Sequence, residues 1–293
     1  MRWAVLAIVT LISSSAAGEP ELLFTSPWDG GAGLGIESGK ESPVRGPTSV
    51  ALDPLGNVWI LDNFNSRLVG YDEKGTPIGE VLLSPGHRDD LAIGPDGSFA
   101  LLSMHLYRIE VMDKDGRPQG FLKLSPLLAP LGRISFPDEI EIENPHGERF
   151  RLGTVDNPRP IKQVLFGRRM ECGIRVDAGA ARLYIQDNAE VVAEGRQPCR
   201  VTDLDLSQVA SARPATDCSK RSFLIEVERL LPGTKVAVER EVVLVSDNNP
   251  EERWNVGDAW LYQPFRRFAS RDDTAVMILP VKSGMQVWRW SLP

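Results

Sequence analysis

The chain has 293 residues and a formal net charge of −7, from 33 basic and 40 acidic side chains. Binding to nucleic acid needs clustered Lys and Arg, and neither a basic run nor an aromatic-basic patch is present, so we do not expect a nucleic-acid partner. Gly (26) and Pro (22) make up about 16% of the residues, against about 12% in an average protein. This composition indicates many turns between short strands.

The first twenty residues, MRWAVLAIVTLISSSAAGEP, have the pattern of an export signal. Arg2 precedes an apolar run over residues 3–12, which is too short to cross about 30 Å of hydrocarbon. Ser15 and Ala17 are small residues at the −3 and −1 positions of a cleavage site. We therefore expect a signal peptide over residues 1–17, with a short membrane anchor as the alternative.

The remaining residues, 18–293, are expected to form one exported domain, either periplasmic or secreted. No later apolar run approaches the length of a membrane span, so we expect none after signal cleavage. An exported protein with three cysteines is expected to form one disulfide and leave one thiol. We favour Cys199–Cys218 because it would clip a polar segment, and Cys172–Cys199 is the alternative. The absence of CxxC spacing argues against a zinc or thioredoxin-like site.

An internal repeat organises the N-terminal half. Residues 50–85 align with residues 91–126 at an offset of 41 without a gap, and 12 of the 36 positions are identical. Each copy contains four short apolar segments separated by turns that use Pro and Gly. Four antiparallel strands in about 40 residues are typical of a propeller blade.

The first copy, GPTSVALDPLGNVWILDNFNSRLVGYDEKG (residues 46–75), resembles the NHL-repeat family of β-propellers. The second copy resembles it less closely, because Ser103-Met104 replace the Asp-Asn pair of the first. The resemblance implies an all-β propeller with functional groups on loops at the mouth of a central channel.

Further strand ends near residues 144, 187, 247 and 280 continue the spacing, so we expect six four-stranded blades, with five or seven as alternatives. The step from 187 to 247 is too long, which predicts an insertion around residues 199–218. Pairing of residues 21–24 with the last blade near residues 285–290 would close the ring and remove its sheet edges. A β-sandwich with a second domain is the alternative fold.

Polar side chains follow the second strand of several predicted blades. Their carboxylate, amide and imidazole groups could converge at the channel mouth, and hard cations prefer such oxygen ligands. Asp and Asn also hydrogen-bond the backbone of their own turn, and for Asp62 we favour this structural role, with Arg67 as its ion-pair partner. The candidate mouth residues are Asp62, Asn63, Asn65, His105, His146, Asp187, Asn188, Asp247 and Asn248.

Two other polar segments are given structural interpretations. The glycine-rich run at residues 30–35 follows no strand and opens no helix, so we expect a flexible entry loop instead of a dinucleotide cradle. The acidic pairs Asp89-Asp90 and Asp272-Asp273 are expected in solvated turns.

The function that these patterns favour is binding. We expect a monomeric scaffold that presents loops to a protein, peptide or glycan partner, without a cofactor. The alternative is a metal-dependent propeller lyase or lactonase using Ca or Zn at the channel mouth. Similar enzymatic propellers hold zinc through histidines or a divalent cation through oxygen ligands, but this chain has only His87, His105 and His146. It contains no GxSxG, HExxH or P-loop motif.

Overall fold

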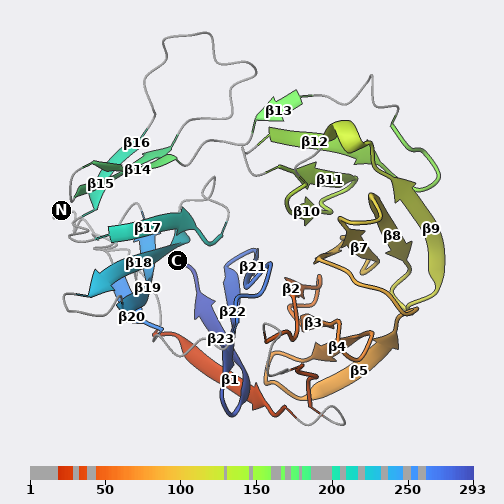
Figure 1. Ribbon diagram of the computed structural model, residues 1–293, viewed down its shortest axis with the longest axis horizontal. Coiled ribbons are helices and arrows are strands. Elements are labelled where there is room, and N and C mark those ends of the chain that lie inside the picture. The colour runs from red at the N-terminus through yellow and green to blue at the C-terminus, as the bar shows by residue number, and fades with distance from the viewer. Residues whose placement is uncertain are drawn as a thin grey trace, which may run out of the picture.

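The structure is a computed structural model of the chain. It describes residues 19–28, 33–37, 44–128, 131–144, 148–159, 166–168, 173–177, 180–185, 200–204, 209–216, 222–231, 237–246, 252–256 and 262–293. The strands in these ranges form five four-stranded antiparallel sheets and one three-stranded antiparallel sheet. Figure 1 shows the sheets arranged as blades around a central axis. The chain folds as a β-propeller, which confirms the predicted fold class.

The first three blades follow one another along the chain, and each runs from an inner to an outer strand. The first blade contains β2 (Ser49–Leu52), β3 (Val58–Asp62), β4 (Arg67–Tyr71) and β5 (Pro77–Leu82). The second contains β6 (Asp90–Ile93), β7 (Phe99–Ser103), β8 (Arg108–Met112) and β9 (Pro118–Lys123). After a short 3₁₀ helix, η1 (Pro126–Leu128), the third contains β10 (Ile134–Ser135), β11 (Ile140–Glu143), β12 (Glu148–Gly153) and β13 (Phe166–Arg168).

The remaining sheets complete the ring. The three-stranded sheet contains β14 (Gly173–Asp177), β15 (Ala180–Ile185) and β16 (Arg200–Leu204). The next blade contains β17 (Val209–Pro214), β18 (Ser222–Leu231), β19 (Ala237–Ser246) and β20 (Glu252–Asn255). The closing blade contains β21 (Phe268–Arg271), β22 (Thr274–Val281), β23 (Gly284–Ser291) and, as its outer strand, β1 (Glu21–Ser26).

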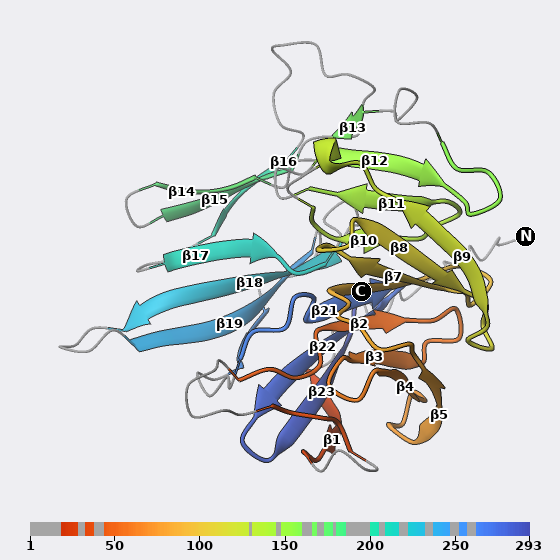
Figure 2. The same ribbon diagram turned by 45° about the vertical axis from the view of Figure 1, so that its right-hand side comes forward.

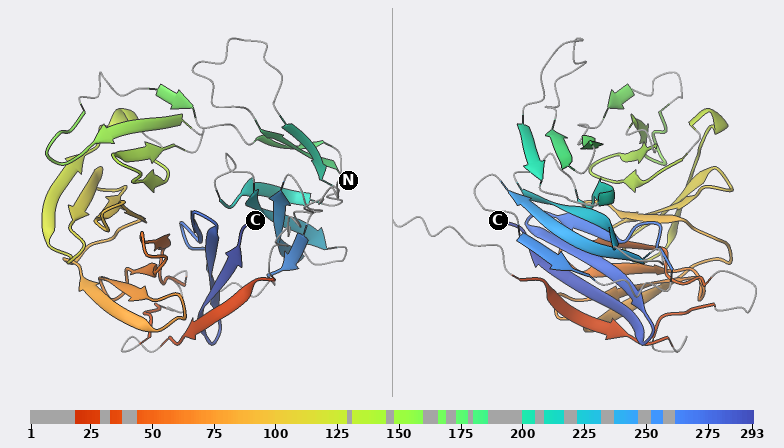
Figure 3. Two further views of the ribbon diagram at one scale, coloured as in Figure 1. Left: turned by 180° about the vertical axis from the view of Figure 1, so that it is seen from behind. Right: turned by 60° about the vertical axis from the view of Figure 1, so that its left-hand side comes forward.

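The pairing of β1 with β23 closes the ring as predicted. Glu21 lies opposite Arg289, and Ser26 lies opposite Met285, so the N-terminal strand supplies the fourth strand of the last blade. Figure 3 shows β1 beside β23 at the edge of the molecule. Such pairing between the two ends of a chain leaves fewer exposed strand edges and ties the first blade to the last.

The 41-residue offset holds in the backbone as well as in the sequence. Gly56 and Gly97 occupy equivalent turns with φ of 82° and 86°, a region that glycine enters without steric cost. Ser66 and Tyr107 are also equivalent, and both have φ near 50°, at 49° and 48°. The predicted repeat is therefore a structural repeat, with the same turn conformation at both ends of the two blades.

The hydrophobic core lies between neighbouring blades, and successive side chains of a strand serve different clusters. In β3, Ile60 packs with residues of the closing blade, whereas Leu61 packs with residues of the second blade. This alternation is the period of two expected of a strand that is covered on both faces. A third cluster joins the second and third blades, and a fourth joins the β17–β20 blade to the closing blade around the buried Trp290.

The C-terminal half contains the extra length that the strand spacing predicted. The segment predicted as an insertion, residues 199–218, supplies β16 and β17, the last strand of one sheet and the first of the next. Part of the extra length lies in β18 and β19, which have ten residues each and extend beyond the ring in Figure 2. The 41-residue spacing showed that extra residues lie between positions 187 and 247. It could not distinguish an inserted loop from longer strands.

Two predictions concern residues that the structure does not describe. The signal peptide over residues 1–17 and all three cysteines, Cys172, Cys199 and Cys218, lie outside the described ranges. The cleavage site and the disulfide therefore remain predictions. In the described part of the chain, no helix combines the length and apolar character that crossing a membrane requires.

Candidate functional site

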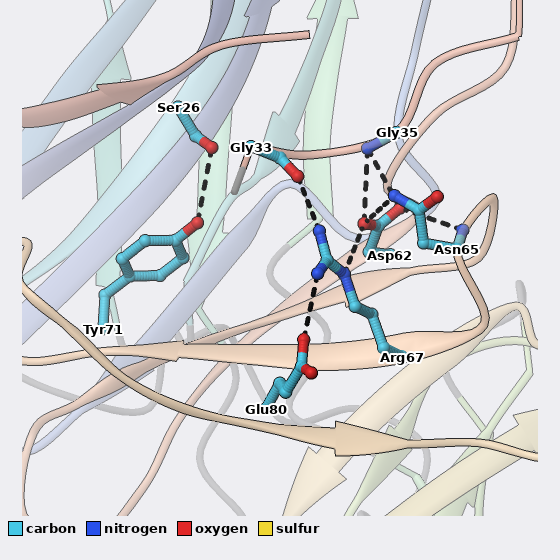
Figure 4. A network of polar contacts seen from close by, with 8 residues as sticks. All are labelled: Ser26, Gly33, Gly35, Asp62, Asn65, Arg67, Tyr71 and Glu80. Atoms are coloured by element: carbon cyan, nitrogen blue, oxygen red, sulfur yellow. Dashed lines mark hydrogen bonds and ion pairs between the residues drawn. The ribbon is translucent and has the colours of Figure 1, made fainter. Parts of the chain in front are cut away.

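The Asp62 carboxylate, at the end of β3, is fully buried and is used to hold the chain together (Figure 4). Its oxygens accept hydrogen bonds from the Asn65 side-chain amide at 2.8 Å and from Arg67 Nε at 3.1 Å. They also accept the backbone N–H of Gly35 at 3.3 Å. The predicted Asp62–Arg67 ion pair is present. It joins the turn of the first blade to the entry segment, which is the chain between β1 and β2 and is described at residues 27–28, 33–37 and 44–48.

Arg67 adds further contacts, and we call the pair Asp62 and Arg67, with the entry-segment backbone that they bind, the Asp62 clamp. Its Nη2 donates to the Gly33 carbonyl at 2.6 Å, and its Nη1 pairs with Glu80 at 2.9 Å. Partial burial opposes the charge of Arg67, but its bonds with Asp62 and Glu80 outweigh that effect and raise its pKa. Gly33 and Gly35 belong to the run predicted as a flexible entry loop. Both are instead buried and fixed to the first blade by two charged side chains.

Asn63 connects two blades. Its side-chain oxygen accepts the Arg88 backbone N–H at 3.1 Å, while its side-chain nitrogen donates to the Arg88 carbonyl and, at 2.8 Å, to the Thr48 hydroxyl. The amide thus satisfies both backbone polar groups of one residue, Arg88, in the loop that leads into the second blade. Asn63 is a structural link, in agreement with the interpretation of these turns as architectural.

The predicted ring of mouth residues is only partly within the described structure. Asp62, Asn63 and Asn65 lie together in one turn and bind one another or neighbouring backbone, as given above. His105 is also described and lies in the turn between β7 and β8. The remaining candidates lie outside the described ranges: His146, Asp187, Asn188, Asp247 and Asn248. Among the residues that are described, no group of three or more His, Cys, Asp or Glu side chains is placed to hold a metal ion.

A cavity of about 840 Å³ opens beside the Asp62 clamp, at the end of the ring where β2 begins and β3 ends. One wall is formed by the entry segment, in which Glu37 and Arg45 pair through both backbone hydrogen bonds. Its lining combines apolar, amide and charged groups: Glu37, Val44, Arg45, Gly46, Thr48, Asn63, Phe64, His87, Tyr262, Gln263 and Pro264. The Phe64 side chain is the large apolar group on this rim, and the residue is 54% exposed.

Tyr262 forms the inner wall of this cavity. Its hydroxyl donates to the Pro47 carbonyl at 3.1 Å. Burial raises the pKa of Tyr262, and the negative charge of Asp62 adds to that effect. The phenol is therefore held neutral and acts as a hydrogen-bond donor, which makes it part of the wall and not a base.

Two histidines lie next to each other at this mouth. The rings of His87 and His105 have centroids 6.2 Å apart, and His87 Nε2 lies 3.3 Å from Asp89 Oδ1. His105 was predicted at the mouth from the repeat. His87 had no predicted place, because it lies in the loop between blades, where the 41-residue offset gives no equivalent.

A smaller cavity, of about 340 Å³, lies deeper in the channel and is lined by inner-strand residues of four blades. Beside it, Asp90 Oδ2 pairs with Arg266 Nη2 at 2.6 Å and accepts the Ile134 N–H at 2.9 Å. Asp90 Oδ1 accepts the Ser49 hydroxyl at 2.8 Å. One fully buried carboxylate thus joins four segments at the centre of the ring.

This finding corrects the prediction that Asp89-Asp90 lies in a solvated turn. Asp90 is fully buried at the start of an inner strand, whereas Asp272 and Asp273 are exposed in a turn as predicted. The offset of 41 offered one clue, because Asp90 is equivalent to Ser49, which is also the first residue of an inner strand. Nothing in the sequence pointed to Arg266 as its partner.

No protein-family model matches the chain, and no curated protein matches its sequence. Solved structures resemble it. A virginiamycin B lyase from Staphylococcus aureus is 12% identical with a TM-score of 0.43, covering 89% of this chain and 99% of that one. BamB from Moraxella catarrhalis is 12% identical with a TM-score of 0.40, covering 94% and 98%. The RRP9 WD40 repeats are 11% identical with a TM-score of 0.45, covering 92% and 99%. At this level the similarity concerns the fold alone.

Proposed function

We propose that this chain is an exported, NHL-like β-propeller that binds a peptide segment of a partner protein in the cavity at its channel mouth. The observation that carries the proposal is the cavity of about 840 Å³ with an exposed phenylalanine at its rim. Its volume falls within the range of about 300–1,000 Å³ that is usual for ligand sites. A ring of blades with a large open cavity at its mouth suits a binding module that works as a monomer.

The chemistry of the lining favours a peptide over a glycan. Phe64 offers an exposed apolar ring for an anchoring side chain, and Glu37 and Arg45 offer charges of both signs. Apolar anchors surrounded by polar and charged groups are typical of protein recognition. The second aromatic wall residue, Tyr262, is partly buried with its hydroxyl bonded to the backbone, so it offers little face for stacking on a sugar.

The alternative, a metal-dependent lyase or lactonase, gains little support from the predicted oxygen ligands. The carboxylate of Asp62 and the amide of Asn63 are engaged with their own turn and the neighbouring loop. A hard cation would need several such oxygens free to converge. Metal analysis of the purified protein tests this alternative.

A peptide-display screen tests the proposal. Purified residues 18–293 are screened against a random peptide library and against a glycan array, and selected ligands are measured by calorimetry. We expect peptide ligands whose affinity falls by roughly tenfold or more in Phe64→Asp, the effect of losing one anchoring contact. Leu55→Asp is the matched control, because Leu55 is 85% exposed on the turn at the opposite end of the same blade.

The proposal is overturned if no peptide is selected, if only glycans bind, or if both variants weaken binding equally. Export is tested separately by N-terminal sequencing of protein recovered outside the cytoplasm. Cleavage before Gly18 is expected, and an intact N-terminus in that fraction would argue against the signal peptide.

A further inference from the structure

The cavity of about 340 Å³ extends toward the end of the ring opposite to the channel mouth. Three of its lining residues, Leu52, Ile93 and Arg271, are the last residues of β2, β6 and β21, whereas the mouth lies where β2 begins. Figure 1 shows β2, β10 and β21 around the central axis. Ser135 and Pro137 also line the cavity and are exposed, so it is open to solvent. Its volume is within the range of about 300–1,000 Å³ that is usual for small-molecule sites.

Arg271 reaches across this cavity and keeps unused hydrogen-bond donors. Its Nη2 donates to the Ile93 carbonyl at 2.9 Å, which ties the closing blade to the second blade and fixes the guanidinium. Its Nε and Nη1 bond to no other residue in the described part of the chain, and neither atom is buried. A guanidinium is planar and can bind a carboxylate through two parallel N–H groups. The remaining donors of Arg271 can receive a carboxylate in this way.

The other charges of the lining already have partners. Glu141 accepts a hydrogen bond from Arg151 at 2.8 Å. The remaining charged lining residues are engaged as well: Arg133, Glu143 and Arg266. Asp272 and Asp273, in the turn after β21, are exposed, so salt screens their repulsion of an anion more than it weakens a direct contact with Arg271. Since Arg271 has no carboxylate partner among the described residues, an anionic ligand would compensate its charge.

Much of the remaining wall is apolar. Leu52, Ile93, Phe136 and Phe268 supply aliphatic and aromatic surface to the cavity. Burial of apolar groups of a ligand against this surface would be favourable, whereas an inorganic anion would lose its water without gaining such contacts. One available cation beside an apolar wall therefore suits a ligand that has both a carboxylate and an apolar body.

We propose that this cavity binds a small organic acid, with its carboxylate on Arg271 and its apolar body against Leu52, Ile93 and the two phenylalanines. The site is separate from the cavity of about 840 Å³ at the mouth and shares no lining residue with it. It does not depend on the proposed peptide binding.

Calorimetric titration of the purified protein tests the proposal with acetate, butanoate, hexanoate and benzoate, with the amides of the same acids and with phosphate. We expect one equivalent of hexanoate or benzoate to bind. Affinity should rise by up to about fourfold for each CH₂ from acetate to hexanoate. The amides and phosphate should bind at least about tenfold more weakly. Arg271→Gln should weaken hexanoate binding by at least about tenfold, and Arg271→Lys, which keeps the charge without the planar fork, should weaken it less.

Arg117→Gln is the matched control. Arg117 is 75% exposed in the turn between β8 and β9, so this variant removes the same charge without touching the cavity and should leave hexanoate binding unchanged. Phe64→Asp, at the mouth, should also leave it unchanged. Thermal unfolding without ligand reports whether each variant folds, and Arg271→Lys gives the result if Arg271→Gln does not.

The proposal is overturned if no carboxylate binds, or if the amides or phosphate bind as tightly as hexanoate. It is equally overturned if the folded Arg271 variants bind hexanoate like the unmodified protein, or if Arg117→Gln weakens binding as much as they do. Loss of hexanoate binding in Phe64→Asp would place the acid in the mouth cavity and would also overturn the proposal.

Discussion

The first and second blades share a backbone but use the same arginine differently. In the first blade, Arg67 pairs with Asp62 of its own turn and holds the entry segment. In the second, the equivalent Arg108 faces Ser103, which has no charge, and pairs instead with Glu110. Glu110 also pairs with Arg88 at 2.7 Å. The two blades therefore share the same strands and turns, but their equivalent polar side chains bind different neighbours.

This difference follows from the neighbouring segment that the turn of each blade contacts. The first blade carries the entry segment over its turn, and a buried carboxylate there satisfies a backbone N–H and a guanidinium at once. The second blade has no such segment, and Ser103 needs only to hold the His87 carbonyl. Its Glu110 serves the nearly buried Arg88 of the interblade loop instead. Local neighbours, and not the repeat, determine which side chain occupies each equivalent position.

The largest effect is expected at the inner strands, where Ser49 and Asp90 are equivalent. Asp90→Ala leaves the Arg266 guanidinium without its carboxylate in a largely buried setting, and should lower the free energy of unfolding by about 3–5 kcal/mol. Ser49→Ala removes one neutral donor and should cost about 1 kcal/mol. Urea unfolding measures both. Equal losses in the two variants would show that the central ion pair contributes little.

A smaller difference is expected at the turns, where Asp62 and Ser103 are equivalent. Asp62→Ala should lower the free energy of unfolding by about 2–3 kcal/mol, because Arg67 keeps Glu80 and the Gly33 carbonyl as partners. Ser103→Ala should cost about 1 kcal/mol. Denaturant midpoints at unchanged slope give the values. If Ser103→Ala were as costly as Asp62→Ala, the clamp on the entry segment would not be the source of the difference.

The blades themselves could be predicted because a period of 41 residues and turn glycines leave a direct record in the sequence. The Asp62–Arg67 pair was also predictable, since both residues belong to one turn. Asp90 with Arg266, and His87 with His105, were not. Each joins segments that the ring brings together from different loops or blades, and such contacts have no fixed spacing. The length of β18 and β19 escaped prediction because an excess between two strand ends does not show where it lies.

The smallest effect concerns Tyr262, which the closing segment contributes to the wall opposite the first blade. Burial and Asp62 raise its pKa in the folded protein above that of an unfolded chain, which is about 10. A raised pKa gives stability that is complete below about pH 10 and is lost as the pH rises further, because the unfolded state then releases a proton that the folded state keeps. The loss should reach about 1.4 kcal/mol for each pH unit above this value.

Tyr262→Phe removes this proton, so its unfolding free energy should fall less steeply above about pH 10 than that of the unmodified protein. At neutral pH the variant loses only the hydrogen bond to Pro47, worth about 1 kcal/mol. Absorbance titration of the native protein gives an independent count, because Tyr262→Phe should have one fewer tyrosine that resists ionisation than the unmodified protein. Because Asp62 contributes to the shift, Asp62→Asn should lower the pKa of Tyr262, whereas Ser103→Asp, in the turn of the second blade, should leave it unchanged. If both substitutions changed the pKa of Tyr262 equally, the shift would come from the overall charge of the protein and not from Asp62 in particular.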